Sequence, residues 1–290
     1  MNKKKEAWAG WLFMSPALII FIVLVIIPTI ASFLLSFTEW NFLSGFAGIK
    51  FKGIDNFTRL FTRDRKFNKA LINTFIYAFT TVPITVSLSL LTAYMLNSKV
   101  YLKKFFRMCF FIPYISSMVA LSAVFKFLFS EHGPINAVLR AFGAETLPQW
   151  ITDSSLCRVP VISVMVYAGL GFCLIVYMAA LQNVPKELYN AAAIDGAGPV
   201  TTFFKVTLPI ISPTTFYLLI VRLIGAFKIF TAVNIMGFGG NSVSLVKIVY
   251  DTAFGSYNFG YASAASWVLV AIILAITLIQ IWGQKKWVHY

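Results

Sequence analysis

Residues 160–181 read PVISVMVYAGLGFCLIVYMAAL, and residues 183–199 just after them read NVPKELYNAAAIDGAGP. The first stretch contains no charged residue and is long enough to cross a bilayer core, which takes about 20 apolar residues as a helix. In the second stretch Pro185 is a helix-start signal, and Gly196 followed by Gly198–Pro199 is a helix-stop signal. Together they predict a membrane-spanning helix followed by a short capped helix outside the hydrocarbon core.

Apolar runs of the same kind occur at five further places in the chain. Hydrophobic residues make up 59% and charged residues 12%, against about 25% charged in soluble domains, which excludes the soluble and disordered classes. A signal peptide would also begin with basic residues such as Lys3–Lys5, but the first run is longer than its apolar region. The sequence predicts an all-α membrane protein, a single domain over residues 1–290, with six transmembrane helices at about 11–37, 70–96, 108–129, 160–181, 209–236 and 261–282.

The chain carries a formal net charge of +14. In a membrane protein such an excess comes from basic residues that flank spans and face anionic lipid, so we expect no nucleic-acid partner. Six spans place both termini on one side of the membrane. Eleven basic residues then lie on that side and ten on the other, and this near-equal count does not decide the orientation.

Several kinds of chemistry are missing from the sequence. No Gly-Lys dipeptide exists, so the chain has no phosphate-binding P-loop. The two histidines, His132 and His289, and the three cysteines have no metal-ligand spacing. No acidic residue falls inside the six predicted spans, whereas ion-coupled carriers usually keep carboxylates there. We expect no enzyme activity, cofactor or metal, and any uphill transport must take its energy from another subunit.

Three cations lie in or near predicted spans. Lys126 is near a span end, where its side chain is expected to extend toward the interface. Arg222 and Lys228 lie deeper in the fifth span, where a charge normally faces a cavity or a partner. The sequence leaves open whether that partner is a carbonyl, a neighbouring subunit or a ligand. The flanking Phe227 and Phe230 fit either ordinary packing or stacking against a sugar ring.

The capped segment after the fourth span has further local signals. Glu187 falls in the first turn of the expected helix, where the helix dipole favours an acid. Thr201–Thr202 can cap a second short helix that ends before Pro209. Positions at i, i+3 and i+4 share one face of a helix, and here they are Leu188, Ala191 and Ala192.

This segment resembles the E-A-A loop of ABC-importer permeases, which reads E-A-A-x-x-x-G and is followed by I-x-L-P. Asn190 stands in place of the leading Glu of the family, and Glu187 lies one turn earlier. The resemblance is to the carbohydrate branch of multiple-sugar, raffinose-type and maltose-type systems, and to the first of their two permeases. The residues that match the loop pattern are Ala191, Ala192, Gly196, Val206, Leu208 and Pro209.

The resemblance extends over nearly the whole chain. After the glycine pair Gly239–Gly240, where family members often have Pro, this chain has Asn241. The other stretches that fit sugar permeases are residues 53–57, 70–74, 110–113, 133–136, 227–230 and 260–264.

For the coupling loop, residues 185–209, the resemblance implies a cytoplasmic position between helices 4 and 5 and contact with an ATPase. Both termini are then cytoplasmic, in a bacterial cytoplasmic membrane. The implied partners are a second permease subunit, two copies of an ABC ATPase, an extracellular sugar-binding protein, the lipid bilayer and a sugar. We expect a neutral oligosaccharide, and the alternative is a phosphate or uronate, which Arg222 and Lys228 would suit. The implied ATPase-coupling residues are Glu187, Asn190, Ala191, Ala192, Asp195 and Gly196.

By resemblance to the maltose permease, the substrate path is expected on the fourth and fifth spans. Tyr167 and Gly171 would lie on one side of the path. Lys228, Thr231 and Asn234, at i, i+3 and i+6, would lie on one stripe of a helix on the other side. The alternative is that these polar groups bind the second permease and never meet sugar. At the level of function, the alternative is a stand-alone secondary carrier or channel.

Overall fold

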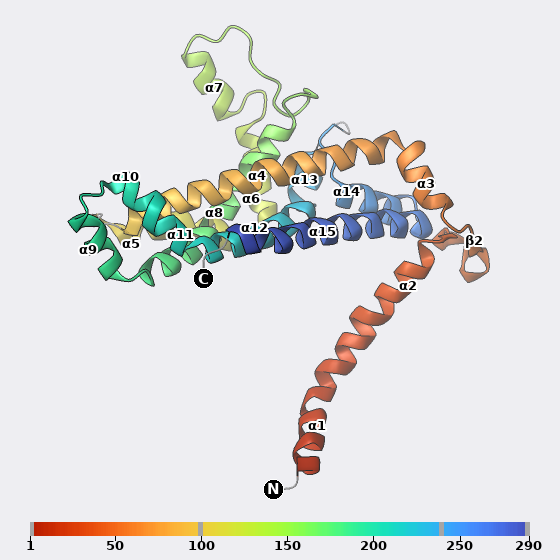
Figure 1. Ribbon diagram of the computed structural model, residues 1–290. Helices are drawn as coiled ribbons and strands as arrows, with labels where there is room; N and C mark the ends of the chain where they lie inside the picture. Colours follow the sequence, from red (N-terminus) through yellow and green to blue (C-terminus); the bar gives the residue numbers. More distant parts are fainter. Residues whose placement is uncertain (1–2, 98–100, 238–240, 288–290) are drawn as a thin grey trace. The chain divides into compact units, whose positions relative to one another are not determined.

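The computed structural model describes residues 3–97, 101–237 and 241–287 (Figure 1). Gly239, Gly240 and His289 lie outside the described residues. The chain divides into two compact units. Unit 1 comprises Met1–Asp64 and Ile248–Val270, and unit 2 comprises Arg65–Lys247 and Ala271–Tyr290.

In the described part of the chain, five helical stretches are long and apolar enough to cross a membrane. A bent helix pair supplies a sixth span if the pair is counted as one. Each predicted span therefore has a counterpart, and the predicted all-α membrane fold class is confirmed. The five stretches are Gly10–Leu35, Arg65–Asn97, Arg158–Gln182, Ser212–Met236 and Phe259–Gln284.

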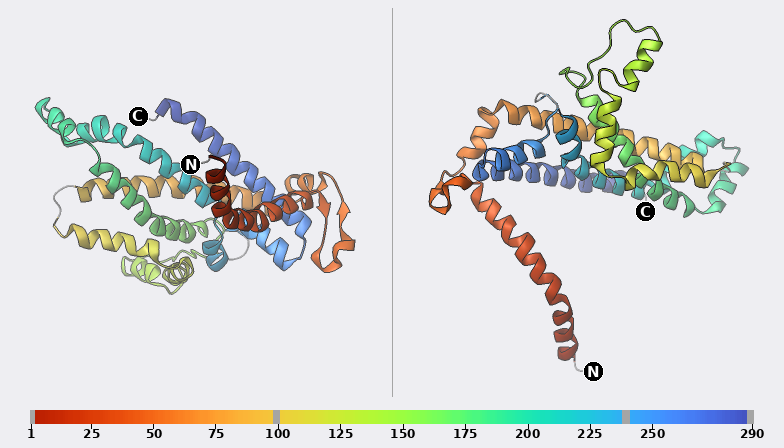
Figure 2. Two further views of the ribbon diagram at one scale, coloured as in Figure 1. Left: turned by 90° about the horizontal axis from the view of Figure 1, so that it is seen from below. Right: turned by 180° about the vertical axis from the view of Figure 1, so that it is seen from behind.

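The third span differs from its prediction. The apolar run over residues 108–129 predicts one continuous helix, but α5 (Lys103–Ile115) and α6 (Met118–Leu128) meet at an angle of 101°, visible in the right panel of Figure 2. Ser116 and Ser117 both have extended backbone conformations, which end α5 before α6 begins. Apolarity predicts that a segment enters the bilayer but carries no information about its direction. The prediction of one continuous helix for the third span is therefore wrong.

The fifth span is also interrupted. It contains α11 (Leu208–Ile210), α12 (Ser212–Phe227) and α13 (Thr231–Met236). The Ser244 hydroxyl donates a 2.7 Å hydrogen bond to the Ile229 carbonyl, which is left without a helical partner at the break between α12 and α13. The prediction that Lys228, Thr231 and Asn234 share one helical stripe is wrong, because Lys228 terminates α12 and the other two belong to α13.

Unit 1 begins with an uninterrupted helical stretch made of α1 (Lys3–Phe21), the π-helical turn η1 (Ile22–Ile26) and α2 (Ile27–Leu35). No residue of the most apolar part of Gly10–Leu35 is buried inside the chain. This stretch therefore gains its stability from lipid or from another subunit and not from the core of unit 1.

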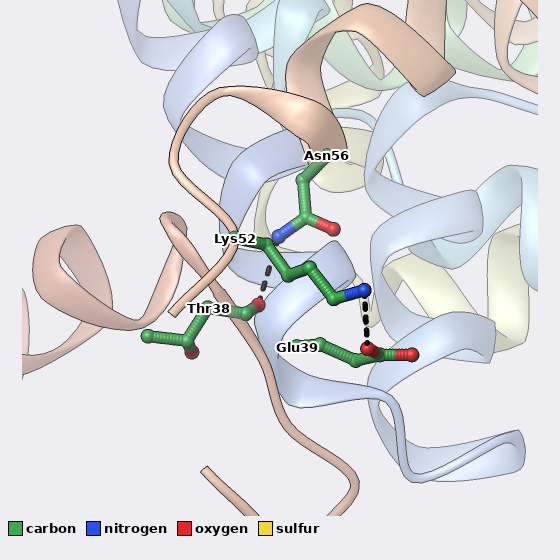
Figure 3. A network of polar contacts seen from close by, with 4 residues as sticks. All are labelled: Thr38, Glu39, Lys52 and Asn56. Atoms are coloured by element: carbon green, nitrogen blue, oxygen red, sulfur yellow. Dashed lines mark hydrogen bonds and ion pairs between the residues drawn. The ribbon is translucent and has the colours of Figure 1, made fainter. Parts of the chain in front are cut away.

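A small two-stranded antiparallel sheet follows, with β1 (Thr38–Glu39) paired to β2 (Lys50–Phe51). The short 3₁₀ turns η2 (Phe42–Ser44) and η3 (Phe46–Gly48) connect the strands, and α3 (Asp55–Thr62) comes next. The buried amide of Asn56 donates a 2.9 Å hydrogen bond to the Ser36 carbonyl. It also donates a 2.8 Å hydrogen bond to the Thr38 carbonyl, and Lys52 pairs with Glu39 at 3.2 Å (Figure 3).

Unit 1 is completed by η5 (Asp251–Gly255) and the first part of α15 (Phe259–Trp287). The Gly260 position lies against the backbone of Thr38 and Trp40, where a Cβ atom would collide with both. Small residues, which allow close helix approach, are buried here, with Ala264 0% exposed and Ala265 1% exposed.

Unit 2 is built around α4 (Arg65–Asn97), which packs along α8 (Arg158–Gln182), with α12 against α4 and α5 against α8. Tyr77 and Tyr177 are fully buried between these helices. The buried hydroxyl groups of Thr74 and Thr81 in α4 donate to the carbonyls of Ala70 and Tyr77 one turn earlier, and so need no water in the bilayer. The remaining elements of this part are α7 (Pro134–Ala141) and α14 (Leu245–Tyr250), which begins in unit 2.

Asn73, which is 0% exposed, organises a polar network in unit 2. Its amide donates to the Asn241 carbonyl at 2.8 Å and to the Val243 carbonyl at 2.9 Å. Its oxygen accepts a 2.8 Å hydrogen bond from Nε of Arg158, and Lys69 donates to the Asn241 side chain. Asn241, where the family often has Pro, is thus held by both its backbone and its side chain.

Lys126 in α6 does not depend on the membrane interface for its polar contact. Its ammonium group donates a 3.1 Å hydrogen bond to the Ile235 carbonyl in α13. The side chain therefore joins α6 to α13, and its extension toward the membrane interface stays a prediction.

Candidate functional site

The first candidate site is the segment after α8, where helix α9 (Lys186–Ile194) lies beside α10 (Pro199–Thr202) at one end of the unit 2 helices (Figure 1). Pro185 is the N-cap of α9, Glu187 falls in its first turn and Asp195 is its C-cap. Gly196 then adopts φ = +72°, a left-handed conformation that strains other residue types. The local start and stop signals predict α9 correctly.

The second short helix differs from its prediction. Gly198 is the N-cap of α10 and Pro199 its first residue, so Thr201 and Thr202 lie inside this helix and do not cap it. Helical backbone also continues past the expected end, through the π-helical turn η4 (Phe203–Thr207) into α11. Pro at the first position of a helix is favoured because its missing N–H has no helical partner there, and this signal explains the earlier start.

Between α9 and the α10–η4 segment lies a groove of about 550 Å³. It brings together Ala191, Ala192, Asp195 and Gly196 of the predicted coupling residues, together with Leu188 of the predicted close-packing face. Ala192 is buried at 8% exposure. Glu187 and Asn190 are exposed and are not among the residues that line the groove.

The segment is fixed to unit 2 by side chains from its second half. Phe203 is buried and packs edge-to-face on Tyr94 of α4, with ring centroids 4.7 Å apart. The buried hydroxyl of Thr207 lies 3.3 Å from the Tyr189 hydroxyl of α9. The Tyr189–Thr207 contact holds α9 against the second half of the segment, which continues through η4 and α11 and, after a turn at Ile211, into α12.

The segment also exposes large apolar side chains that the sequence analysis did not single out. Ile194 is 86% exposed, Val200 70% and Phe204 59%. Exposed apolar residues around a groove are typical of a docking surface for another protein. Ile194 is the last residue of α9, Val200 lies in α10 and Phe204 in η4.

The second candidate site is a cavity of about 330 Å³ inside unit 2. It lies where two interrupted helices meet α8, since its lining comes from the α5–α6 break, the α12–α13 break and the middle of α8. Of the predicted path residues, Lys228 and Thr231 line it. The remaining lining residues that bear on chemistry are Tyr114, Ser116, Gly169, Arg222 and Phe230.

The other predicted path residues are not among those that line this cavity. Tyr167 is 42% exposed and packs against Phe125 with ring centroids 5.5 Å apart. Gly171 is a buried contact point of α8, where a Cβ atom would collide with the Phe110 carbonyl of α5. Asn234 is exposed in α13.

Sequence reasoning missed Tyr114, Ser116 and Gly169 among the lining residues, and Gly169 has a clear role. A Cβ atom at this position would collide with the guanidinium group of Arg222 and approach the methyl group of Thr85 to 2.9 Å. Only glycine leaves room for the Arg222 side chain across α8. The sequence signal was a glycine in one apolar helix and an arginine in another, since a glycine leaves room for the arginine side chain. The sequence does not say which glycine lies against Arg222.

Among the described residues there is no group of three or more His, Cys, Asp and Glu side chains that could hold a metal ion. The two candidate sites are therefore an exposed groove beside α9 and a polar cavity at the α5–α6 and α12–α13 breaks.

Residues 57–286 match the family described as the binding-protein-dependent transport system inner membrane component. The chain belongs to this family, and it is a multi-pass protein of the cytoplasmic membrane. It is similar to the probable ABC transporter permease protein YesP of Bacillus subtilis, at 35% identity over 99% of this chain and 94% of that protein. It is also similar to the lactose transport system permease protein LacF of Rhizobium radiobacter, at 33% identity over 96% and 94%.

Among solved structures, the fold is similar to a chain of the bacterial alginate ABC transporter crystallised with its alginate pentasaccharide-bound periplasmic protein. The TM-score is 0.84 at 24% identity, with 97% of this chain and 96% of that chain covered. The resemblance to ABC-importer permeases is thereby confirmed. The expectation that the chain is not an enzyme is confirmed as well, because permease components leave ATP hydrolysis to a separate subunit.

Proposed function

We propose that this chain is the membrane-spanning subunit of an ATP-driven importer of oligosaccharides. It pairs with a second permease and two copies of an ABC ATPase, and a binding protein outside the membrane delivers the sugar. Relatives named for lactose and for arabinooligosaccharide transport support the substrate class. The observation that carries the proposal is the exposed α9 segment with its groove, because a permease without its own ATPase needs a firm surface on which one can act.

In this proposal the coupling loop and both chain termini are cytoplasmic. Ala191, Ala192, Asp195 and Gly196 form the groove that receives the ATPase, and the exposed Glu187 and Asn190 contact it from the outer face of α9. ATP-driven closure moves α9, and the continuous backbone through η4 and α11 carries the movement to α12, one wall of the cavity.

The sugar passes the cavity at the two helix breaks. Lys228 and Thr231 donate hydrogen bonds to it, and Phe230 and Tyr114 offer aromatic faces. Tyr167, Gly171 and Asn234 belong to the same path above or below this cavity. Broken helices suit such a site, because unpaired backbone is tolerated at membrane depth only where it lines a polar cavity.

The primary test reconstitutes the complete transporter in vesicles. We expect saccharide uptake that needs both ATP and the binding protein. Vesicles that contain only this chain should take up nothing. Uptake by the chain alone would contradict the proposal and favour a stand-alone carrier or channel.

A matched pair of alanines tests the coupling groove. Ala191 and Ala193 are both exposed in α9, but only Ala191 lines the groove. Ala191→Leu should uncouple ATP hydrolysis from uptake, while Ala193→Leu should behave as wild type. Gly196→Leu should uncouple more strongly, because it adds bulk and strains a left-handed residue. An assembled Ala191→Leu transporter that works at the wild-type rate would contradict this assignment.

Lys228→Met tests the substrate path. If Lys228 contacts sugar, uptake falls while ATPase stimulation by the loaded binding protein and assembly with the second permease remain intact. Loss of assembly would instead assign Lys228 to the interface with the second permease.

A further inference from the structure

The cavity of unit 2 has an unusual charge balance for a space inside membrane-spanning helices. Two cations, Arg222 and Lys228, are among the residues that line it, and no described lining residue is an Asp or a Glu. Neither cation forms an ion pair or a side-chain hydrogen bond with any residue that the structure describes. The cavity therefore carries two uncompensated positive charges.

The described residues around Arg222 supply no hydrogen-bond acceptor for its buried Nε atom. Its guanidinium crosses α8 over Gly169. The hydroxyl of Thr85, which is 0% exposed and whose methyl group is close to the same glycine, is also unpartnered. A buried charged donor without an acceptor costs free energy, so this arrangement calls for a ligand that supplies acceptor atoms.

Lys228 faces the same cavity from the end of α12. As the C-cap residue it has a favourable interaction with the helix dipole, which explains a cation at this position but not a second one six residues earlier. The N-terminal end of α6 also borders the cavity through Ser116 and Met118, and Ser117, its N-cap residue, makes no capping hydrogen bond. The partial positive charge of that helix end adds to the two full charges.

We infer that the cavity admits the anionic group of an acidic saccharide, such as a carboxylate, phosphate or sulfonate, held between Arg222 and Lys228. This rests on the proposed function and narrows its substrate class. The sequence alone favoured a neutral oligosaccharide. The cavity reverses this expectation, because hydroxyl groups can accept hydrogen bonds from both cations but leave both charges uncompensated.

The volume and the aromatic lining fit this ligand. About 330 Å³ is near the lower end of the range for small-molecule pockets, about 300–1,000 Å³. Tyr114 and Phe230 supply rings against which a sugar can lie, while the anionic group reaches the cations. A guanidinium group binds planar carboxylates and phosphates through two parallel hydrogen bonds, so Arg222 is the principal anchor.

The test offers the complete reconstituted transporter a mixed pool of probes: alginate digests as acidic oligosaccharides, arabinan and starch digests as neutral ones, and hexose phosphates. Mass spectrometry identifies what enters the vesicles. We expect the imported species to carry a negative charge. Import of neutral species alone would overturn the inference and leave the proposed function standing. Import of no saccharide would overturn both.

Variants then test which side chains are needed for uptake of the acidic species. Arg222→Gln and Lys228→Met should each lower uptake of the acidic species about tenfold or more while still assembling with the second permease. Arg222→Lys, which keeps the charge, should retain more uptake than Arg222→Gln. Arg140→Gln, at an exposed cation in α7 away from the cavity, serves as the control and should match wild type.

Two results would overturn the inference at this stage. Unchanged uptake of the acidic species in Arg222→Gln would mean that the guanidinium does not contact the ligand. Failure of Arg222→Gln and Lys228→Met to assemble with the second permease would mean that a carboxylate of that subunit, and not a saccharide, compensates the charges.

Discussion

Two arginines of unit 2 stand in opposite situations. Arg158, the first residue of α8, donates through Nε to the Asn73 side chain at 2.8 Å, and Asn73 in turn holds two backbone carbonyls. Arg222 in α12 has the same donor buried with no partner in the described structure. A cation with its hydrogen bonds satisfied stabilises the fold, whereas an unsatisfied one costs stability and is retained for a ligand or another subunit.

The largest effect on stability is expected at the satisfied network. Asn73→Ala removes three hydrogen bonds at a fully buried position and leaves the Arg158 donor and two carbonyls unpaired. We expect a loss of about 3–5 kcal/mol in the free energy of unfolding. Thermal unfolding of the purified protein in detergent measures this. Asn234→Ala, at an exposed asparagine in the same unit, should change stability by no more than about 0.5 kcal/mol. Equal effects in the two variants would contradict the structural role of Asn73.

A smaller effect is expected where the unsatisfied arginine crosses α8. Gly169→Ala places a methyl group against the Arg222 guanidinium and the Thr85 methyl group and should cost about 1–3 kcal/mol. Gly225→Ala, in α12 with open space around the added Cβ, is the control and should be neutral or stabilising.

The pairing of Gly169 with Arg222 can be isolated in a double-mutant cycle. In an Arg222→Gln background, Gly169→Ala should cost less than in the wild type, because the shorter side chain yields to the methyl group. Additive costs would mean that Gly169 does not position Arg222.

The smallest loss is expected at Lys126, which is intermediate between the two arginines. Its ammonium group donates to the Ile235 carbonyl of α13 at 3.1 Å. Lys126→Met should lower the free energy of unfolding by about 1 kcal/mol, and the α6–α13 region should become less protected in hydrogen exchange. Protection unchanged around residue 235 would show that this hydrogen bond does not join the two helices.

The sequence predicts what depends on local or compositional signals. Spans follow from apolar length, and α9 follows from Pro185, Glu187 and Gly196, which act within one or two turns of the chain. The family pattern adds the grouping of Ala191, Ala192 and Gly196, which the structure brings to one groove.

The sequence does not predict the two helix breaks that create the cavity. Ser116 and Ser117 lie in an apolar run that fits a continuous span equally well, although both have extended backbone. The α12–α13 break is stabilised by a residue distant in sequence, because the Ser244 hydroxyl donates to the Ile229 carbonyl. For this reason the helical stripe predicted for Lys228 and Thr231 does not exist, although both residues line the cavity.

The most direct measurement compares Arg158→Gln with Arg222→Gln in the complete transporter, recording thermal stability and ATP-driven uptake for each. We predict that Arg158→Gln lowers stability by about 1.5–3 kcal/mol because it weakens a charge-assisted hydrogen bond. We predict that Arg222→Gln leaves stability unchanged or raised and lowers uptake about tenfold or more. A destabilised Arg222→Gln protein with normal uptake per folded transporter would contradict the division between a structural and a transporting arginine.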